Sequence, residues 1–579
     1  MARLDRLAPV REIAQVGAVL GREFSYELIH AISSVDEEIL QHGLRQLVET
    51  ELVYQRGLPP QATYLFKHAL VQDTAYQSLL KSRRQQLHQR VARVLVEQFP
   101  QTVVAQPELV AHHYTEAGLA TQAIPYWQQA GERAIQRSAH VEARAHLTRG
   151  LELLQSLPDT PERAPQELTL QLTLGATLQA TKGYTAPEVE SVYSRARVLC
   201  RQVGETSQLF AALIGLRRVY YVQAKLQTAY ELDEELLRLA HHAQDVFLLT
   251  MAHQSMGATL FALGELVAAR EHFEQSMALY DPQQHRAYIL LHGEDPGVLD
   301  LSFVSLALML LGYPAQALRK SHEALTLAQK LAHPYSIMFA LSYASCLHQG
   351  CREEHLAQEQ AEAALALSTE QGFAQLWVGR QTVLRGWALV MQGQAEAEII
   401  PMRHGLAARL ATGAALWQPY HLALLAEAYG KGGQAEEGLT VLTEAMAVVS
   451  KTEERYYEAE LYRLRGELTL QSKTSFEQVL DKSKMSQNKS EDINIQHPTP
   501  SIQAEAEAEA CFLKAIEIAR HQSAKSLELR AVMSLSRLWQ RQGKKDEARQ
   551  LLAEIYGWFT EGFETKDLQE AKALLDKLS

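Results

Sequence analysis

Four side chains that could bind a metal ion lie close together near the middle of the sequence. Cys346, His348, Cys351 and His355 are of the types that hold zinc. Their C-x4-C spacing differs from that of a zinc knuckle, and Gly350 is expected at a turn that would separate the ligands. We therefore interpret these residues as packing residues, and the sequence predicts no metal site.

Motifs for phosphate binding and for nucleophilic catalysis are absent from the sequence. It contains no G-x-x-x-x-G-K-[ST] loop, no G-x-S-x-G elbow and no H-E-x-x-H pair. The run GKGG at 430–433 fits a turn between two helices. The adjacent histidines at 112–113 and 241–242 point to different faces of a helix, as packing or surface residues do. The sequence therefore predicts neither catalytic residues nor a cofactor.

Composition restricts the partners of the chain. Lys and Arg number 56 against 68 Asp and Glu, a formal charge of −12 that disfavours a broad nucleic-acid surface or a polybasic membrane contact. Four cysteines in 579 residues suit a reducing compartment. The first ten residues lack the apolar core of a signal peptide, and the longest apolar stretch, 298–313, is interrupted by Asp300. We expect a cytoplasmic protein without a membrane span.

The first hundred residues have their own pattern. Helical periodicity is found at 10–20, 25–32, 36–49, 68–80 and 84–98, and the β-prone runs 52–55 and 63–66 flank GLPP, as in a hairpin. This order predicts a winged helix over 1–105. Residues 1–100 carry 12 basic and 11 acidic side chains, and the expected third helix is acidic, which disfavours DNA binding.

Beyond residue 106 the sequence predicts repeated helical hairpins of the tetratricopeptide (TPR) type. A small residue on the first helix is followed twelve residues later by a second small residue and sixteen later by a large one, because two helices that cross closely leave room only for small side chains. The turn glycines 264, 312, 350, 393 and 433 lie 38 to 48 residues apart, more than the usual spacing of about 34. The alternative is an irregular helical bundle. The copies are Gly257/Leu260/Ala269/Phe273, Ala111/Tyr114/Ala123/Trp127/Ala130, Gly131/Ala143/Leu147/Gly150, Ala426/Tyr429/Gly438/Leu442/Ala445 and Ser536/Trp539/Ala548/Leu552.

One hairpin is interrupted in the sequence. Gly466 lies on a first helix, but the matching Ala508, Phe512 and Ala515 come about thirty residues late. The polar stretch between them lacks apolar periodicity and predicts a disordered insertion over 471–503. The expected organisation is a winged-helix domain at 1–105, repeats at 106–470, the insertion, and repeats at 504–579: an all-α, TPR-like (MalT-like) α-solenoid behind a small winged helix.

Six strings of the sequence carry a resemblance to one family. They are LDRL (4–7), GREFS (21–25), FKHAL (66–70), YDPQQHR (280–286), DPGV (295–298) and YGWFTEGF (556–563). They resemble the region after the nucleotide-binding domain of large bacterial STAND-class signalling ATPases, which often carry a class III adenylate/guanylate cyclase domain, as soluble adenylyl cyclases do. The resemblance covers essentially the whole chain.

The resemblance implies that the ATPase and cyclase elements precede Met1, so we expect no ATP hydrolysis and no cyclic nucleotide formation by this chain. In related ATPases a winged-helix histidine reaches the β-phosphate of bound ADP. His68 matches that position in part, since Ala69 stands where the family has Asp. Here His68 could contact only a partner's nucleotide, and packing at a helix start is the alternative.

The resulting hypothesis is a non-catalytic scaffold or sensor. Its concave repeat surface would bind a protein, peptide or small effector and relay this to a signalling ATPase or cyclase. Arg217, Arg218, Tyr220 and Tyr221 form the densest candidate groove, although the tyrosines could equally fill gaps between repeats. The alternatives are a winged-helix transcriptional regulator with an effector-binding repeat domain, and a truncated part of a cyclase-type protein.

Overall fold

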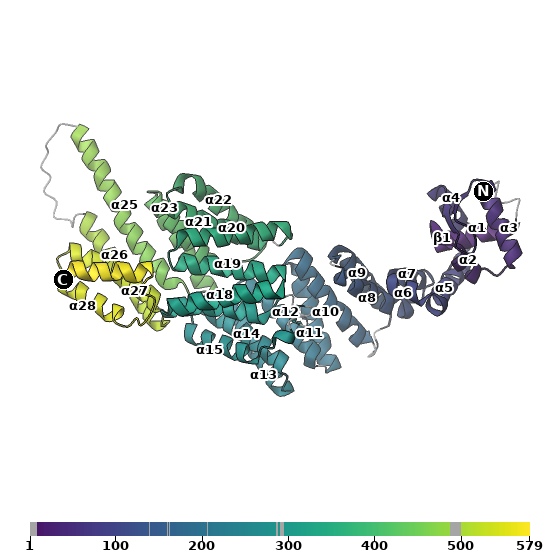
Figure 1. Cartoon of the computed structure of the whole chain (residues 1–579), viewed down its shortest axis with the longest axis horizontal. Helices are drawn as coiled ribbons and strands as arrows, with labels where there is room; N and C mark the ends of the chain where they lie inside the picture. Colours follow the sequence, from purple (N-terminus) through teal and green to yellow (C-terminus); the bar gives the residue numbers. More distant parts are fainter. Residues whose placement is uncertain are drawn as a thin grey trace. The chain divides into compact units, whose positions relative to one another are not determined.

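The chain is almost entirely helical (Figure 1). The computed structural model describes residues 8–579 except 138, 159, 161–162, 205, 285–287, 290–293, 374 and 487–499. It divides into two compact units. The N-terminal unit comprises Met1–Thr181 with Arg195–Gly204, and the C-terminal unit comprises Lys182–Ser194 with Glu205–Ser579.

The N-terminal unit begins with three helices and a small antiparallel sheet whose strand order is β1-β3-β2. Phe24 pairs with Tyr64 across β1 and β3, and their rings stack at 5.7 Å between centroids. The hairpin β2–β3 was predicted from the sequence, whereas β1 was not. Three residues between two helices carry no period of their own, so only pairing with β3 defines β1 as a strand. The elements are α1 (Ala8–Leu20), β1 (Glu23–Ser25), α2 (Tyr26–Ile32), α3 (Glu37–Glu49), β2 (Val53–Arg56), β3 (Thr63–Phe66), α4 (Ala69–Gln77) and α5 (Lys81–Gln98).

Helical hairpins follow directly in the same unit. A Cβ atom on Gly131 of α8 would lie 2.6 Å from the Leu147 side chain of α9, so only glycine permits this crossing. In the preceding pair, Ala111 of α7 and Ala123 of α8 are fully buried. These residues therefore occupy helix crossings, as their spacing predicts. The elements are α6 (Pro100–Ala105), α7 (Pro107–Glu116), α8 (Ala120–Gln136), α9 (His140–Gln155), α10 (Arg163–Lys182) and α11 (Pro187–Val203). The part of α11 up to Ser194 belongs to the C-terminal unit.

The C-terminal unit is a solenoid of helical hairpins, as predicted. In each hairpin a first helix packs against the second helix that follows it, after a short turn in every hairpin except α25–α26 (Figure 1). First helices are α12 (Thr206–Val222), α14 (Val246–Leu263), α17 (Pro296–Leu311), α19 (Pro334–Gly350), α21 (Gln375–Met391), α23 (Gln418–Lys431), α25 (Glu458–Ser486) and α27 (Lys525–Arg541). Their partners are α13 (Leu226–Ala243), α15 (Leu266–Leu279), α18 (Pro314–Leu331), α20 (Glu354–Glu370), α22 (Ala395–Ala411), α24 (Ala435–Thr452), α26 (Pro500–His521) and α28 (Lys545–Tyr556), and α29 (Lys566–Leu578) ends the chain.

The contact of a small residue with a large one is the recurring feature of these hairpins. A Cβ atom on Gly257 would lie 2.8 Å from the Phe273 ring, and one on Gly466 would lie 2.5 Å from the Phe512 ring. The interrupted hairpin is thus closed by α25 and α26, as its residues predicted. Gly386 faces Met402 at the same sixteen-residue spacing, a copy that the sequence analysis missed because methionine replaces the aromatic residue.

The alanines of the predicted repeat signature lie in the interior of the hairpins. Ala269 of α15 and Ala445 of α24 are fully buried, and Ala130 of α8 is buried as well. All three are on second helices, where a longer side chain would meet the neighbouring helix. These alanines therefore serve packing and offer no surface to a ligand.

Trp127 is less buried than the other residues of the signature. Its side chain is only half-buried on α8. The indole N–H donates to the Thr115 hydroxyl at 3.0 Å, and the ring stacks on His146 of α9 with 5.4 Å between centroids. An indole has a polar N–H that needs a partner when it is covered, so Trp127 joins α7, α8 and α9 at the edge of the crossing.

The predicted insertion over 471–503 is shorter than expected. α25 continues to Ser486 and α26 already begins at Pro500, so helix occupies both ends of that segment. Lengthening an existing helix adds a hydrogen bond for each residue, and the Ser, Lys, Gln and Glu residues there tolerate helix without an apolar period. The remaining part of the predicted insertion, 487–499, lies outside the described residues.

The C-terminal ends of first helices are capped by residues that belong five hairpins further along the chain. The Val222 carbonyl, which ends α12, accepts hydrogen bonds from the backbone N–H groups of Ala415 (3.0 Å) and Leu416 (3.1 Å), just before α23. The Ala262 carbonyl near the end of α14 accepts one from Arg455 N–H at 2.9 Å, just before α25. Terminal carbonyls lack partners within their own helix. The solenoid therefore completes a turn in about five hairpins and contacts itself.

This self-contact buries some first helices on all sides. Every residue of α17 from Pro296 to Leu311 is buried. Within the described part of the chain, only α14 is long and apolar enough to cross a membrane by length and composition, and 72% of its apolar window is buried inside the protein. Both helices have the composition of a core helix enclosed by its own solenoid.

α17 also carries a carboxyl group in this interior. Asp300 is fully buried, and neither of its side-chain oxygens has a hydrogen-bond partner within ordinary bonding geometry. The Ser276 hydroxyl of α15 donates to the Thr250 carbonyl at 3.0 Å instead. Burial, the largest cause, raises the pKa of Asp300 well above its usual value of 3.8.

Substituting Gly466→Val should destabilise the C-terminal unit. The added side chain would overlap the Phe512 ring and force α25 and α26 apart, and overpacking of this kind costs about 1–3 kcal/mol. The urea midpoint of unfolding measures the effect. Ala510→Val, on an exposed position of α26, is the matched control and should change stability by about 0.5 kcal/mol or less. Equal shifts for the two variants would contradict the proposed helix contact.

Asp300→Asn should reduce the pH dependence of stability. Because the folded-state pKa of Asp300 is raised, the native state binds the proton more tightly, and the free energy of unfolding falls as pH rises above 3.8. The Asn variant lacks this loss, so its advantage over the wild type should grow with pH in urea titrations. Asp576→Asn, at an exposed position, should follow the wild-type curve. A constant difference at all pH values would contradict the effect.

Candidate functional site

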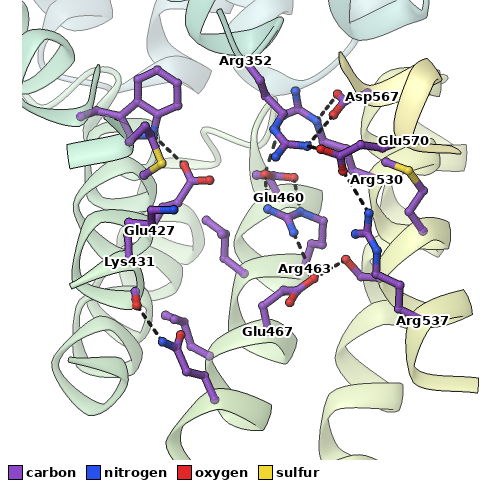
Figure 2. A pocket seen from close by; sticks show the side chains of 18 of the residues that line it. Arg352, Glu427, Lys431, Glu460, Arg463, Glu467, Arg530, Arg537, Asp567 and Glu570 are labelled. Carbon is purple, nitrogen blue, oxygen red and sulfur yellow. Dashed lines mark hydrogen bonds and ion pairs between the residues drawn. The ribbon is translucent and has the colours of Figure 1, made fainter. Parts of the chain in front are cut away.

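A cavity of about 460 Å³ opens on the inner side of the C-terminal unit. It lies among α19, α21, α23, α25 and α27, all first helices, and is completed by α29 (Figure 2). Leu464 and Leu468 of α25, with Met391 and Met533, give it apolar surface. The charged lining residues are Arg352, Glu427, Lys431, Glu460, Arg463, Glu467, Arg530, Arg537, Asp567 and Glu570.

One wall of the cavity is formed by α21 and α23. The Trp387 indole N–H donates to a Glu427 carboxylate oxygen at 2.7 Å, which fixes that carboxylate at the cavity edge. Lys431, one turn further along α23, is exposed and has no ion-pair partner among the residues that the structure describes. Figure 2 shows Glu427 and Lys431 across the cavity from Arg530 and Asp567. This wall therefore presents one exposed cation beside a held carboxylate.

The opposite wall and the floor carry a network of ion pairs. Arg463 bonds both Glu460 oxygens, at 2.8 and 2.9 Å, and both residues belong to α25. Arg530 of α27 bonds Asp567 of α29 at 2.6 Å and lies 3.8 Å from Glu460. Arg352 bonds Asp567 as well, at 3.2 Å. Three helices and the turn after α19 are thus tied together by charge-assisted hydrogen bonds.

The network continues to the rim of the cavity through α29. Glu570 accepts from Arg352 at 3.1 Å and from Arg537 at 3.0 Å. Burial alone would raise the pKa of Asp567, but the Arg530 and Arg352 guanidiniums outweigh it and hold that pKa below its usual 3.8. The Asp567 carboxylate is therefore ionised at neutral pH and forms part of the cavity wall.

The lining of this cavity offers hydrogen-bonding groups of both charges. Its lining has five basic and five acidic side chains, so the charges balance locally. Within the described ranges, no group of three or more His, Cys, Asp or Glu residues could hold a metal ion. Cys346 instead accepts from Arg380 at 3.2 Å, and His348 bonds Glu353, so these members of the cysteine–histidine cluster have protein partners. Donors and acceptors interleaved with apolar surface suit a peptide-like ligand.

Two of the four predicted groove residues lie in the interior, which corrects the prediction for them. Arg217 Nε donates to Asp233 at 3.0 Å and its Nη2 to the Thr259 hydroxyl at 2.8 Å, and Arg217 and Asp233 are 4% and 0% exposed. Tyr221 is buried under this guanidinium and donates to the Ala258 carbonyl. Arg217 and Asp233 are sixteen residues apart, the spacing of Gly257 and Phe273, so a buried ion pair replaces the usual packing contact of the repeat.

The other two groove residues remain partly exposed and bond acidic groups. Arg218 donates to Glu294 at 2.9 Å, and Tyr220 donates to Glu190 at 3.0 Å. His68 is exposed at the N-cap of α4 in the N-terminal unit and makes no side-chain capping bond. The nucleotide contact predicted for His68 and a ligand contact of Arg218 and Tyr220 stay predictions.

The repeat-signature residues are separate from the cavity. Their predicted role is structural, and none of them is among the residues that line it. The positions concerned are Gly257, Ala269, Phe273, Ala111, Trp127, Ala130 and Ala445. They set how the helices cross, and most of them lie on second helices, whereas the cavity is lined by first helices and α29.

Sequence reasoning missed the cavity itself. Glu460, Arg463 and Glu467 recur at the spacing of one helix face, so the pattern along α25 was available as a signal. However, alternating charge on a helix usually marks a solvated face. This face lies beside Arg352 and Asp567 because successive turns of the solenoid pack against each other. A local sequence pattern does not predict that packing.

Comparison with known proteins gives limited information. No family model matches the chain. An uncharacterized protein of Rhizobium meliloti is 24% identical over 469 residues, which cover 80% of this chain and 45% of the relative, so the chain spans about half the length of the curated relative it matches.

Solved helical-repeat structures are similar at low identity. They include a STAND protein with a tetratricopeptide repeat sensor from Pyrococcus horikoshii (12% identity, TM-score 0.41, covering 79% of this chain and 65% of that one). The apo form of RapI gives 13% identity and a TM-score of 0.40, covering 50% and 97% of the two chains. Yeast Tom70 is 11% identical with a TM-score of 0.30, and the match covers 86% of this chain and 96% of that one. Such values carry no statement about ligands or partners.

Asp567→Asn should loosen α29. Removing one partner of a buried ion pair leaves the Arg530 charge to be balanced by Glu460 alone, 3.8 Å away, at a cost of up to about 3–5 kcal/mol. Because the folded-state pKa of Asp567 is lowered, the wild type holds this stability above pH 3.8 and loses it as pH falls below that value. Amide hydrogen exchange of α29 should therefore accelerate in the variant at neutral pH.

The control for this substitution is a surface ion pair on the same helix. Lys566 of α29 bonds Glu354 at 2.7 Å, with side chains 43% and 24% exposed. Glu354→Gln should cost only about 0–1 kcal/mol because such pairs are solvated. Similar acceleration of α29 exchange by both variants would show that the buried network does not hold this helix.

Proposed function

We propose that the chain is a non-catalytic scaffold or sensor whose C-terminal unit binds a short peptide, or an extended segment of a partner protein, in the cavity on its inner side. The observation that carries the proposal is the cavity itself. First helices of five hairpins and α29 converge on one solvent-open site whose lining combines balanced charges with apolar side chains. A cavity of about 460 Å³ lies within the range of about 300–1,000 Å³ common for ligand sites.

A peptide suits this lining better than a uniformly charged ligand. Peptides combine backbone donors and acceptors with side chains of either charge, and the cavity offers both. Lys431 and Glu427 present a cation and an anion on one wall, and Arg537 with Glu570 presents another pair across the cavity. A ligand of one sign would gain from half of these groups and be repelled by the rest. The methionines and leucines would accept apolar side chains.

The N-terminal part would serve as the relay. Its three helices followed by an antiparallel hairpin, together with the strings GREFS and FKHAL, support a winged-helix domain over residues 1–105, with repeats at 106–470 and 504–579. The partner would be a STAND-type signalling ATPase or a nucleotide cyclase in the cytoplasm, and exposed His68 would contact its nucleotide. The acidic residues Glu37, Glu38 and Glu49 on α3 oppose a role in DNA recognition.

Relay requires that the ligand distinguishes two arrangements of the protein. The cavity supplies a physical basis for this, because α19 and α29 come from different turns of the solenoid and both carry wall residues. A ligand that competes for Arg352 or Asp567 would change how these turns are held together. The coupling free energy equals the difference in ligand affinity between the two arrangements.

Display selection with the full chain and a random peptide library tests the proposal. We expect enrichment of peptides of mixed charge whose affinity falls at least about tenfold in Lys431→Glu, since reversing one contacting charge costs more than about 1.4 kcal/mol. Fluorescence anisotropy of the selected peptides measures this. Lys431 has no ion pair to lose among the described residues, so its reversal should leave the fold intact.

Lys451→Glu is the matched control. Lys451 is exposed on α24, the second helix of the hairpin that contains Lys431, and does not line the cavity. Selected peptides should bind this variant with wild-type affinity. Peptides that lose equal affinity in both variants, or a selection without enrichment, would refute binding in the cavity.

A further inference from the structure

A second polar site on the C-terminal unit surrounds the carboxylate of Glu294. Arg218 of α12 donates to Glu294 Oε2 at 2.9 Å. The hydroxyl groups of Tyr184 and Tyr335 donate to Glu294 Oε1 at 3.2 and 3.3 Å. Residues from three distant parts of the sequence thus direct one guanidinium and two phenols at a single carboxylate.

The guanidinium of Arg218 and the two phenols act as hydrogen-bond donors and need an acceptor. Burial raises the pKa of both Tyr184 and Tyr335 above the usual 10.0, so the phenols stay protonated and can donate. A guanidinium with additional hydroxyl donors is an arrangement that recognises carboxylates through charge-assisted hydrogen bonds. The side chains of Arg218 and Glu294 are 11% and 15% exposed, so water reaches the pair.

Glu294 is separable from the helical scaffold that surrounds it. It lies in a bend before α17, and the start of that helix is capped by its neighbour Asp295, which accepts from Val298 N–H and from the Tyr280 hydroxyl. The pair Arg217–Asp233 differs, since both of its members occupy repeat positions inside helices. Glu294 therefore reaches these donors from a connector outside the helices, so a ligand carboxylate could take the place of its side chain without replacing part of a helix.

We propose that Arg218, Tyr184 and Tyr335 form a binding site for the carboxylate of a ligand, and that Glu294 is its built-in occupant. The ligand carboxylate would be that of a peptide C-terminus or of a small organic acid. It would replace Glu294 and leave the charge of Arg218 compensated. This site is independent of the cavity around Arg463, so either could fail without the other.

Chemical rescue with acetate as the probe tests the site. Glu294→Ala should lower the Tm of the C-terminal unit because the carboxylate that accepts from Arg218, Tyr184 and Tyr335 is lost. Acetate should raise that Tm again in a saturable manner, whereas acetamide and chloride at equal ionic strength should not. The matched control Glu190→Ala removes the acceptor of Tyr220 but no guanidinium partner, so acetate should not stabilise it.

Further variants separate the sources of the carboxylate and guard against a folding defect. Combining Glu294→Ala with Tyr335→Phe should weaken the acetate effect several-fold. A tripeptide with a free C-terminus that acts like acetate, while its amidated form does not, would identify a peptide terminus; response to acetate alone would identify a small acid. In the wild type, acetate should accelerate hydrogen exchange of residues 294–301 relative to chloride. Absence of any acetate-specific effect in both the variant and the wild type would overturn the proposal.

Discussion

The fold depends on how closely two helices of a hairpin can approach. At Gly257, Gly386 and Gly466 the facing residue is Phe273, Met402 or Phe512, and a single added carbon would lie within 3 Å of it. Since protein interiors are packed as densely as organic crystals, this contact fixes the crossing of each hairpin. The same crossing, repeated along the chain, sets the rotation from one hairpin to the next.

The rotation from one hairpin to the next brings distant hairpins into contact. After about five hairpins the solenoid meets itself, and the carbonyls of Val222 and Ala262 are capped by backbone groups near α23 and α25. Helices such as α17 are thereby enclosed and need apolar residues all round, which explains a hydropathy close to that of a membrane span in a buried helix. Where the inner surface is not filled by aromatic side chains, the cavity remains.

Charged groups in this unit have two different physical roles. The pair Arg217–Asp233 replaces a packing contact in the interior and is enclosed by neighbouring helices. Arg352, Arg530 and Asp567 line the cavity, where their ion pairs hold different turns of the solenoid together. Glu294 belongs with the second group, because a connector delivers it to partly exposed donors. The two roles therefore differ in how deeply the charged groups are buried and in which part of the chain supplies each partner.

The helical hairpins could be predicted from local residue spacing. Small and large residues at spacings of twelve and sixteen are local, and they located even α25 and α26, whose halves are separated by an insertion. The spacing also placed Ala269 and Ala445 in the interior, whereas the half-buried state of Trp127 depends on its contacts with Thr115 and His146. The sequence also predicted the hairpin β2–β3. It predicted neither β1 nor the full length of α25, because those residues show no periodic arrangement of apolar side chains.

The location of the two sites depends on how the hairpins stack in space. Arg217 and Arg218 are adjacent in the sequence, yet Arg217 bonds Asp233 in the interior of its own hairpin and Arg218 bonds Glu294 of a distant connector. The cavity combines residues from 349 to 570, which come together because the solenoid closes on itself. Helical periodicity reports which face of a helix is apolar, whereas the rotation accumulated over five hairpins determines which faces meet.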